Sequence, residues 1–474
     1  MDCKFLIAGT LSLFTVACAD TLKDAATIAI TNVTVLDGTG APPRSNETVL
    51  IHGNRIVSIG ASESVDVPAD ASMVDGQGKF LIPGLWDMHM HFSLLGGPSI
   101  LPVFTANGVT GVRDNGSGDS VFVWQREIAE GRRMGPRIVS SGLAFVGYET
   151  PENAPGGWAQ GIVSLDDVGP ALRHRSETAD FVKTQDSFMP RDRWSAIAAE
   201  ATEYGMALAG HVPMSLTLEE AIQQGFTSIE HSLGFAMALT TDEADARARV
   251  MAANEDGDGY TALFEEDDRA LGRVDERRLA AVAATMVENG VAFDANLQDL
   301  RAMAWSSSGQ WNDDPRLLYL PEEIADSWRE AAAGDFFNET NTGHLRRTFE
   351  RMPQIVARLH EQGVMILAGT DAGAMFDFPG FDIHSELAML VGGGLSPMNA
   401  IRTATVNPAM FMGMADSLGT VETGKLADLV LLDANPLDDI RNTERIAAVL
   451  QNGNYYDRSA LDAMLAEVRR TPSR

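Results

Sequence analysis

Short apolar runs occur near both ends of the chain, and in the N-terminal runs Val and Ile alternate with polar residues. They cover residues 28–36, 48–52 and 55–59 and return at 429–432 and 446–450. Turn sequences follow several of them, as at Asp37-Gly38, Gly53-Asn54 and Asn452-Gly453. This alternation is typical of half-buried antiparallel strands. It predicts either one small β domain built from both chain ends, over residues 20–79 and 416–474, or two independent β caps.

The middle of the chain alternates apolar runs with amphipathic segments. Eight short apolar runs lie at Phe80–Met88, Gly108–Arg113, Pro136–Ser140, Asp180–Lys183, Met206–His211, Thr227–His231, Val291–Ala295 and Val364–Gly369. Helical patterns separate most of them, as at Arg193–Tyr204 and Glu276–Asn289. Alternating β and α units in this number predict an α/β protein, a parallel (β/α)8 or TIM barrel, over residues 80–415.

Two connections between these runs are unusually long. Leu233–Asp275 follows the sixth run, and Leu297–Gly363 separates the seventh from the eighth. The second contains Trp305, Trp311, Tyr319 and Trp328, residue types that disordered segments lack. Because both connections leave the carboxyl ends of strands, we expect them to form walls or a lid over the barrel mouth.

The net charge of the chain limits the classes of binding partner that we expect. The chain has 474 residues, with 66 acidic and 36 basic side chains, and a formal net charge of −30. Nucleic acids and anionic lipid surfaces require basic patches, so neither is an expected partner. The expected partner is a small molecule, and the chain is compatible with a monomer or a homo-oligomer.

The pattern of the N-terminal residues predicts an export signal. Lys4 precedes an apolar run from Phe5 to Ala17, which is too short to span a bilayer but has the length of a signal-peptide core. Ala17-x-Ala19 suits cleavage after residue 19, and Thr15–Cys18 is a loose lipoprotein box that would anchor the chain at Cys18. The alternative is a buried N-terminal strand. We expect a periplasmic or secreted protein with signal peptide 1–19 and no transmembrane span.

Metal-binding residue types gather where the predicted strands end. His89 and His91 close the first run, and residues two apart on a strand point to the same face. His211, His231 and Asp371 close the fifth, sixth and eighth runs. Four imidazoles and a carboxylate on one rim form a suitable zinc environment with room for a water molecule.

Lys183 ends the fourth run in a chain with only five lysines. Beside metal ions an ammonium group would be repelled, so a neutral amine or its CO2 adduct is expected. A carbamate requires a neutral amine, which lysine can supply when its pKa is lowered. The alternative is a lysine paired with a nearby carboxylate.

These residues resemble the amidohydrolase superfamily, in the branch that groups imidazolonepropionase-like proteins with metal-dependent Xaa-Pro dipeptidases. The resemblance extends from about Ile28 to Asp457 and is carried by Pro83–His91, Gly108–Asp114, Gly135–Ile138, Ala179–Lys183, Gly210–Pro213, Ile229–His231, Gly369–Gly373, Gly419–Asp428 and Asn435–Leu437. It implies a metal-bearing (β/α)8 barrel with a composite β-sandwich formed from both chain ends.

The resemblance also implies a ligand set. His89, His91 and Asp371 would hold one divalent metal ion and His211 and His231 a second, with zinc the expected metal. Carboxylated Lys183 and a hydroxide would bridge the two ions. Asp371 would act as general acid–base, and Asp87 would either orient a ligand or serve as a turn residue.

The sequence departs from the family in two places. The seventh run reads Phe293–Leu297, where relatives often carry Pro-Thr-Leu. Deaminase relatives place a Glu three residues after the fifth-strand histidine, whereas Met214 stands there in this chain, which argues against deamination. We therefore expect hydrolysis of an amide bond in a peptide-like substrate, such as an Xaa-Pro dipeptide or an N-acyl amino acid. The alternatives are a lactone or cyclic-amide hydrolase and a metal-free interaction protein on the same scaffold.

Three further candidates for a functional role can be explained equally well by a purely structural role. Arg113 could hold a substrate carboxylate or form a structural ion pair. His384 opens a helix after the eighth run, where a substrate contact and a helix-start role are both compatible with the sequence. The segment containing Asn254, Asp256, Asp258 and Glu265 resembles an EF-hand Ca2+ loop, although a solvated acidic turn explains it as well.

Overall fold

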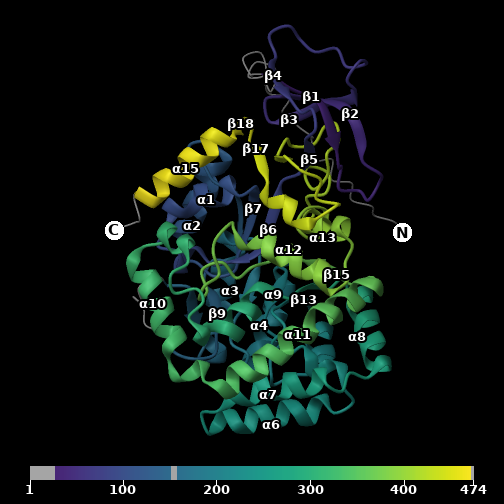
Figure 1. Ribbon diagram of the computed structural model, residues 1–474. Coiled ribbons are helices and arrows are strands. Elements are labelled where there is room, and N and C mark those ends of the chain that lie inside the picture. Colours follow the sequence, from purple (N-terminus) through teal and green to yellow (C-terminus); the bar gives the residue numbers. More distant parts are fainter. Residues whose placement is uncertain (1–26, 151–156, 471–474) are drawn as a thin grey trace, which may run out of the picture.

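The computed structural model describes residues 27–150 and 157–470. One eight-stranded sheet combines strands from the two ends of the chain (Figure 1). Its strands are β1 (Thr27–Val35), β2 (Arg44–His52), β3 (Arg55–Ala61), β4 (Ser72–Asp75), β5 (Phe80–Pro83), β16 (Leu429–Leu432), β17 (Ile446–Gln451) and β18 (Asn454–Asp457).

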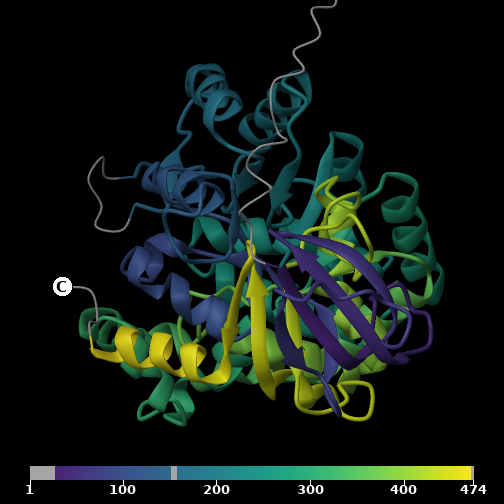
Figure 2. The ribbon, with the colours of Figure 1, turned by 90° about the horizontal axis from the view of Figure 1, so that it is seen from above.

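Strand β5 joins the two halves of this sheet. It pairs parallel with β1, where Leu81 lies opposite Val35, and antiparallel with β16, where Leu81 lies opposite Leu431. From above, the N-terminal and C-terminal strands lie side by side (Figure 2). All five strand-like runs of the terminal segments are therefore strands. The arrangement of these strands as a sandwich, and the exact domain boundaries, stay predictions.

All eight apolar runs of the middle segment contain a strand. The first run divides at Gly84 into β5 and β6 (Leu85–Met90), so the chain passes directly from the end sheet into the barrel region. The others contain β7 (Val109–Asp114), β8 (Arg137–Ser140), β11 (Val182–Thr184), β12 (Leu208–Gly210), β13 (Phe226–Glu230), β14 (Ala292–Asp294) and β15 (Met365–Leu367).

These strands are parallel but do not form one closed ladder. One ladder joins β6, β7 and β8, and a second runs from β10 (Ala159–Gly161) and β9 (Ala144–Val146) through β11 to β15. Backbone hydrogen bonds cross both gaps. The Asp180 amide donates to the Ser140 carbonyl at 2.9 Å across one gap. Across the other, the Met88 amide donates to the Ala368 carbonyl at 2.9 Å and the Asp371 amide to the His89 carbonyl at 2.8 Å. The expectation of a regular closed ladder is thus met only in part, because these strands are three to six residues long.

Helices cover the outside of these strands. They are α1 (Leu101–Ala106), α2 (Ser120–Ala129), α3 (Val168–Thr178), α4 (Arg191–Glu203), α5 (Leu218–Gln223), α8 (Glu276–Glu288), α11 (Glu339–Glu361), α12 (Asp382–Gly393), α13 (Pro397–Thr403) and α14 (Val406–Phe411). The predicted helical segments correspond to α4 and α8. Helix α8 buries Leu279, Val282, Ala283 and Met286, which recur every three or four residues.

The two long connections are largely helical. The first contains α6 (Glu243–Glu255) and α7 (Gly259–Leu271), which lie at the end of the molecule far from the end sheet (Figure 1). The second contains α9 (Leu297–Trp305), α10 (Glu322–Ala333) and the whole of α11. Helix α15 (Arg458–Arg470) follows the last strand and packs on α1. Within the described residues no helix combines the length and apolar character needed to cross a membrane. The predicted signal peptide lies outside these residues.

Candidate metal centre and active site

His89 and His91 lie side by side at the carboxyl end of β6. Their ring centroids are 5.2 Å apart, and both rings are buried. Their Nε2 atoms lie 3.4 Å and 3.0 Å from Oδ1 of Asp371, which follows β15. The predicted H-x-H geometry therefore brings two imidazoles and one carboxylate together, with ligand atoms within 4.8 Å of one another.

His211 and His231 lie beside this group. Their ring centroids are 4.8 Å apart, and the ring of His231 lies 4.6 Å from that of His89. Each Nδ1 atom has a neighbour: Ser187 Oγ at 3.1 Å for His211 and Asp299 Oδ2 at 3.2 Å for His231. The Nε2 atoms of both rings are buried and have no hydrogen-bond partner.

Lys183 extends from β11 into the same space. Its Nζ lies 3.4 Å from Nε2 of His89, and its side chain is buried. Burial lowers the pKa of Lys183 to about 8, although Glu230 and Asp371 act in the opposite direction. A larger fraction of this amine is thus neutral near neutral pH than in an exposed lysine, which favours the CO2 adduct.

The electrostatics of the cluster favour the unprotonated forms of His89, His211 and Asp371. The pKa of His231 is instead raised, because Asp371 and Asp299 outweigh the effect of burial. Burial, reinforced by the positive charge of Lys183, lowers the pKa of His89 well below its ordinary value. For Asp371 burial acts upward, but the nearby His231 and His91 outweigh it and lower the pKa of the carboxyl to about 2. Neutral imidazoles and an ionised carboxylate are the forms that bind metal ions.

Two of the candidate residues adopt left-handed backbone conformations. His231 has a φ of 64° and Asp371 a φ of 58°. In a regular strand consecutive side chains point to opposite faces, yet both Glu230 and His231 approach His89. The inverted backbone at His231 makes this possible. Strained residues of this kind concentrate at functional sites.

Several acidic residues of the site were missed by the sequence analysis. Glu230 Oε2 lies 2.9 Å from Nδ1 of His89, and Asp299 contacts His231. Asp294 forms a further buried group with His89 and Glu230. Two of these residues could have been recognised from the sequence. Glu230 directly precedes His231, and Asp294 lies at the end of the seventh run. Asp299 lies in a long connection, and no pattern identified it.

Asp87 was predicted to orient a ligand or to act as a turn residue. Its buried carboxylate accepts hydrogen bonds from the hydroxyl and amide of Thr370 and from the amide of His89. Burial raises its pKa to about 7 despite these bonds. Asp87 therefore ties the end of β6 to the segment that carries Asp371, and it contacts His89 through the backbone.

Arg113 does not face the barrel mouth. Its buried guanidinium donates to Glu230 Oε1 at 2.5 Å and to the Met88 carbonyl at 2.7 Å. It also borders a cavity of about 320 Å³ that lies at the amino ends of the strands, where Phe181 and Phe411 flank it. This placement favours the structural ion pair over the predicted contact with a substrate carboxylate.

His384 lies in α12, away from the histidine cluster. Its Nδ1 and Nε2 atoms lie 3.0 Å from Thr443 Oγ1 and 3.1 Å from the Asn107 carbonyl oxygen. Burial lowers its pKa to about 4. Both ring nitrogens already have partners in the protein, so the geometry favours a structural role over the predicted substrate contact.

The segment resembling a Ca2+ loop forms a tight turn. Asn254 lies in the last turn of α6, α7 begins at Gly259, and Glu265 pairs with Arg269 at 2.8 Å. Among the described residues, the acidic and histidine groups with metal-binding spacing include neither Asp256, Asp258 nor Glu265. Ca2+ binding therefore stays a prediction, on a geometry that differs from an open twelve-residue loop.

Aromatic side chains of the second long connection pack near Asp371. The rings of Trp311 and Trp328 lie 5.7 Å and 5.9 Å from that of Phe376, five residues after Asp371. The same connection contributes Asp299. It therefore forms part of the wall around the histidine cluster, in line with its expected position at the carboxyl ends of the strands.

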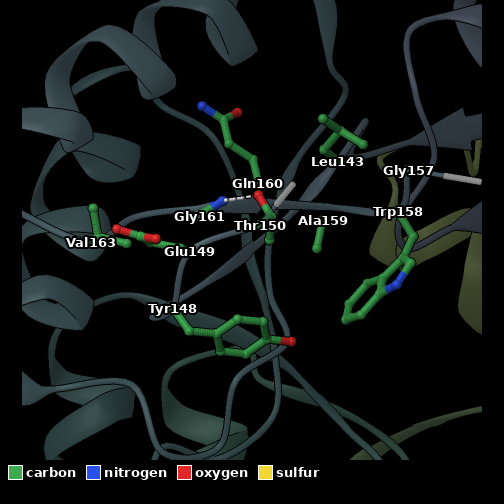
Figure 3. A pocket seen from close by; sticks show the side chains of 10 residues that line it. All are labelled: Leu143, Tyr148, Glu149, Thr150, Gly157, Trp158, Ala159, Gln160, Gly161 and Val163. Carbon is green, nitrogen blue, oxygen red and sulfur yellow. Dashed lines mark hydrogen bonds between the residues drawn. The ribbon is translucent and has the colours of Figure 1, made fainter. Parts of the chain in front are cut away.

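A cavity of about 600 Å³ lies beside β10 and is lined by that strand and by the segments next to β9 and β10 (Figure 3). Tyr148, Glu149 and Trp158 line it, and the Gly161 amide donates a hydrogen bond to Thr150 Oγ1 across one side. Gly116 separates this region from the metal-binding group: a Cβ on Gly116 would lie 2.9 Å from the Trp158 carbonyl oxygen and 3.0 Å from His91 Nδ1. The volume is that of a small-molecule site.

Solved structures resemble the whole chain. A Xaa-Pro dipeptidase with bound methionine superimposes with a TM-score of 0.64 over 91% of this chain and all of its own, at 22% identity. A bottromycin amidohydrolase gives a TM-score of 0.69 over 94% of this chain and 91% of its own, at 20% identity. At these identities the likeness establishes the fold.

Sequence comparison identifies the family. Ochratoxinase from Aspergillus niger is 23% identical over 88% of this chain and 83% of its own length. The model of the amidohydrolase family matches residues 80–455, which include all of the candidate ligands. The chain therefore belongs to the amidohydrolase family, as its motifs predict, and is a hydrolase that acts on amide bonds.

Proposed function

We propose that this protein is an exported, binuclear metal-dependent amidohydrolase that cleaves an amide bond in a small peptide-like substrate, such as an Xaa-Pro dipeptide or an N-acyl amino acid. Family membership supports the reaction class. The substrate class is supported by the names of similar proteins, which include an Xaa-Pro dipeptidase and a bottromycin amidohydrolase. The corresponding architecture is a (β/α)8 barrel over residues 80–415 with a composite end domain.

The unpartnered Nε2 atoms of His211 and His231 are the observation that carries this proposal. Each ring is held through Nδ1, by Ser187 or Asp299, while its Nε2 is buried without a hydrogen bond. An unsatisfied buried polar atom is costly unless a partner binds it. Histidines that bind metal ions show this division, with one nitrogen on the ion and the other on a neighbouring group.

The donor set fits two ions. His89, His91 and Asp371 would hold the first and His211 and His231 the second, with zinc as the expected metal because imidazole and carboxylate ligands suit it. The neutral amine of Lys183 would add to CO2 with loss of one proton. Carboxylated in this way, Lys183 would supply a further anionic ligand from a position beside His89.

Bound divalent ions would lower the pKa of a water molecule from about 15.7 towards 7 and polarise the scissile carbonyl. Asp371 is suited to move the proton. Its carboxylate is ionised, with Oδ1 facing His91 and Oδ2 lying 3.9 Å from His231 Nε2. As general acid–base it would accept a proton during attack and donate it to the leaving nitrogen.

Two other activities compete with this proposal. A lactone or cyclic-amide hydrolase would use the same residues on a ring substrate. A metal-free interaction protein would require the ligand set to be idle, although every ligand that the family resemblance implies is present and clustered. Deamination is disfavoured because Met214 stands where deaminase relatives place a Glu.

Metal content and substrate scope test the proposal together. Protein purified without chelator, from medium containing zinc and bicarbonate, should contain about two transition-metal ions per chain by elemental analysis. It should hydrolyse members of a panel of Xaa-Pro dipeptides and N-acyl amino acids, and chelation should abolish the activity. Turnover of lactones alone would favour the alternative hydrolase. A folded protein without bound metal would favour the interaction protein.

Export and Ca2+ binding are separate parts of the proposal. Intact-mass analysis of the mature chain should show cleavage after residue 19, or a lipid on Cys18, and cell fractionation should recover the protein outside the cytoplasm. Isothermal titration calorimetry with Ca2+ tests for binding at Asn254, Asp256, Asp258 and Glu265. Binding would require the turn between α6 and α7 to rearrange. Absence of heat would remove calcium from the proposed cofactors.

A further inference from the structure

The carboxylate of Glu230 lies directly behind the His89 imidazole. Its Oε2 is 2.9 Å from His89 Nδ1, on the side of the ring opposite the Nε2 that faces Lys183 and Asp371. Nδ2 of the Asn296 amide lies 3.2 Å from the same Nδ1, farther away than the charged carboxylate. Both side chains have no solvent exposure. Glu230 therefore contacts a candidate metal ligand and is shielded from the barrel mouth.

The other oxygen of this carboxylate is occupied as well. Oε1 accepts hydrogen bonds from Arg113 Nη2 and Ser228 Oγ, each at 2.5 Å. Arg113 is itself fixed by the Met88 carbonyl, to which its Nε donates at 2.7 Å. The carboxylate is thus held in place by two donors and presents its remaining oxygen to His89.

We propose that Glu230 is a positioning residue that fixes the tautomer and orientation of His89, so that His89 Nε2 is presented to the metal. This inference rests on the proposed metal-dependent function. The physical reason is that a neutral imidazole carries one proton. An acceptor beside Nδ1 retains that proton there and leaves the Nε2 lone pair free for an ion.

Glu230 is better suited to this role than to binding a metal ion. With His89 and Asp294 it forms a group that has metal-binding spacing. However, the Arg113 guanidinium already pairs with its carboxylate, and the same guanidinium lies 4.0 Å from Asp294. A second cation at this position would face that positive charge at close range, in a site without water to screen it.

The substitution Glu230→Gln tests the role. A carboxylate accepts from His89, Arg113 and Ser228 at once, whereas an amide has one acceptor oxygen and brings an N–H group against one of these donors. Removal of such a supporting group typically weakens metal binding by roughly 10- to 100-fold. The zinc affinity of Glu230→Gln, measured by competition with a chromophoric chelator, should fall by this factor relative to the wild type.

Glu266→Gln is the matched control. Glu266 is a buried glutamate in α7 that pairs with Arg249 and Arg269, remote from the histidine cluster. This substitution removes the same charge and should leave the zinc affinity unchanged. The 15N NMR signals of His89 in metal-free protein provide a second readout: wild type should carry the proton on Nδ1, and Glu230→Gln should lose that preference.

Folding and function can be separated in this design. If Glu230→Gln does not fold, Ser228→Ala removes one of the two donors that hold the carboxylate and should weaken zinc binding by a smaller factor. A folded Glu230→Gln protein with wild-type zinc affinity and an unchanged His89 tautomer would overturn the positioning role. A wild-type protein that binds no metal would refute the proposed function, whereas the tautomer of its metal-free form would still decide the role of Glu230.

Discussion

Nζ of Lys183 lies 3.4 Å from Nε2 of His89, and both atoms are buried among groups that have metal-binding geometry. Burial lowers the pKa of Lys183 to about 8, so its amine loses the proton more readily than an exposed lysine does. A neutral amine beside the Nε2 atom of an imidazole, at the centre of a histidine cluster, is the arrangement from which a bridging carbamate can form.

Lys183→Met should lower the zinc content from two ions per chain to one or fewer. The substitution keeps the approximate volume of the side chain but supplies no amine for CO2. Elemental analysis of protein prepared with zinc and bicarbonate measures the effect. Lys79→Met, which removes an ion pair with Asp433 in the end sheet, is the control and should keep both ions. Two ions retained by Lys183→Met would argue against the carbamate.

Asp371→Asn should abolish proton transfer while preserving the local backbone. Asp371 has a φ of 58°, a conformation that Asn tolerates better than most residues. The amide cannot act as a base, so kcat for amide hydrolysis should fall by about 100- to 10,000-fold. Steady-state kinetics with circular dichroism on the same samples check this. Activity within tenfold of the wild type would assign the proton transfer to another group.

Gly369→Ala should disrupt the site through a steric clash. A Cβ on Gly369 would lie 2.4 Å from Asp294 Oδ2 and 2.6 Å from the His89 Cβ, too close for either to remain in place. We expect weaker zinc binding and a destabilisation of roughly 1–3 kcal/mol, measured by metal titration and urea unfolding. Gly169→Ala in α3 has open space around its Cβ and should be neutral or slightly stabilising.

His384 should make the stability of the protein depend on pH. Burial lowers its pKa from the ordinary 6.5 to about 4, so the unfolded chain binds this proton first as the pH falls. The contribution of neutral His384 to the free energy of unfolding is complete above about pH 6.5 and is lost as the pH falls from 6.5 to 4. It amounts to at most about 3–4 kcal/mol.

His384→Gln removes this titration but keeps an N–H group near the Asn107 carbonyl oxygen. Urea unfolding at pH 7, 6 and 5 should show a smaller acid-induced loss of stability in this variant than in the wild type. His174→Gln, an exposed position in α3, should follow the wild type. Substrate kinetics at pH 7 should be unchanged. A raised KM would instead support the substrate contact expected from the sequence.

The sequence predicted the fold and the site best where metal-binding residue types occupy regular positions on predicted strands. The eight apolar runs and the H-x-H pair follow from a local pattern, because a strand exposes every second side chain to the same face. The strand-end positions of His211, His231 and Asp371 then place them at one edge of the parallel strands. Five of the terminal strands were likewise predictable from short apolar runs and turn residues, whereas β4 and β18 were not predicted. The joining of the terminal strands through β5 in one sheet was only one of two alternatives.

Sequence alone therefore determined which residues meet in the candidate metal-binding cluster, since these lie at the carboxyl ends of parallel strands. Only the tertiary structure decided which residues support them. Asp299 reaches His231 from a long connection, and Arg113 turns away from the mouth to pair with Glu230. Glu230 and His231 both approach His89 because His231 adopts a left-handed backbone conformation. These contacts depend on one local inversion and on packing between distant segments, and neither is encoded in a repeating pattern of hydrophobic and polar residues.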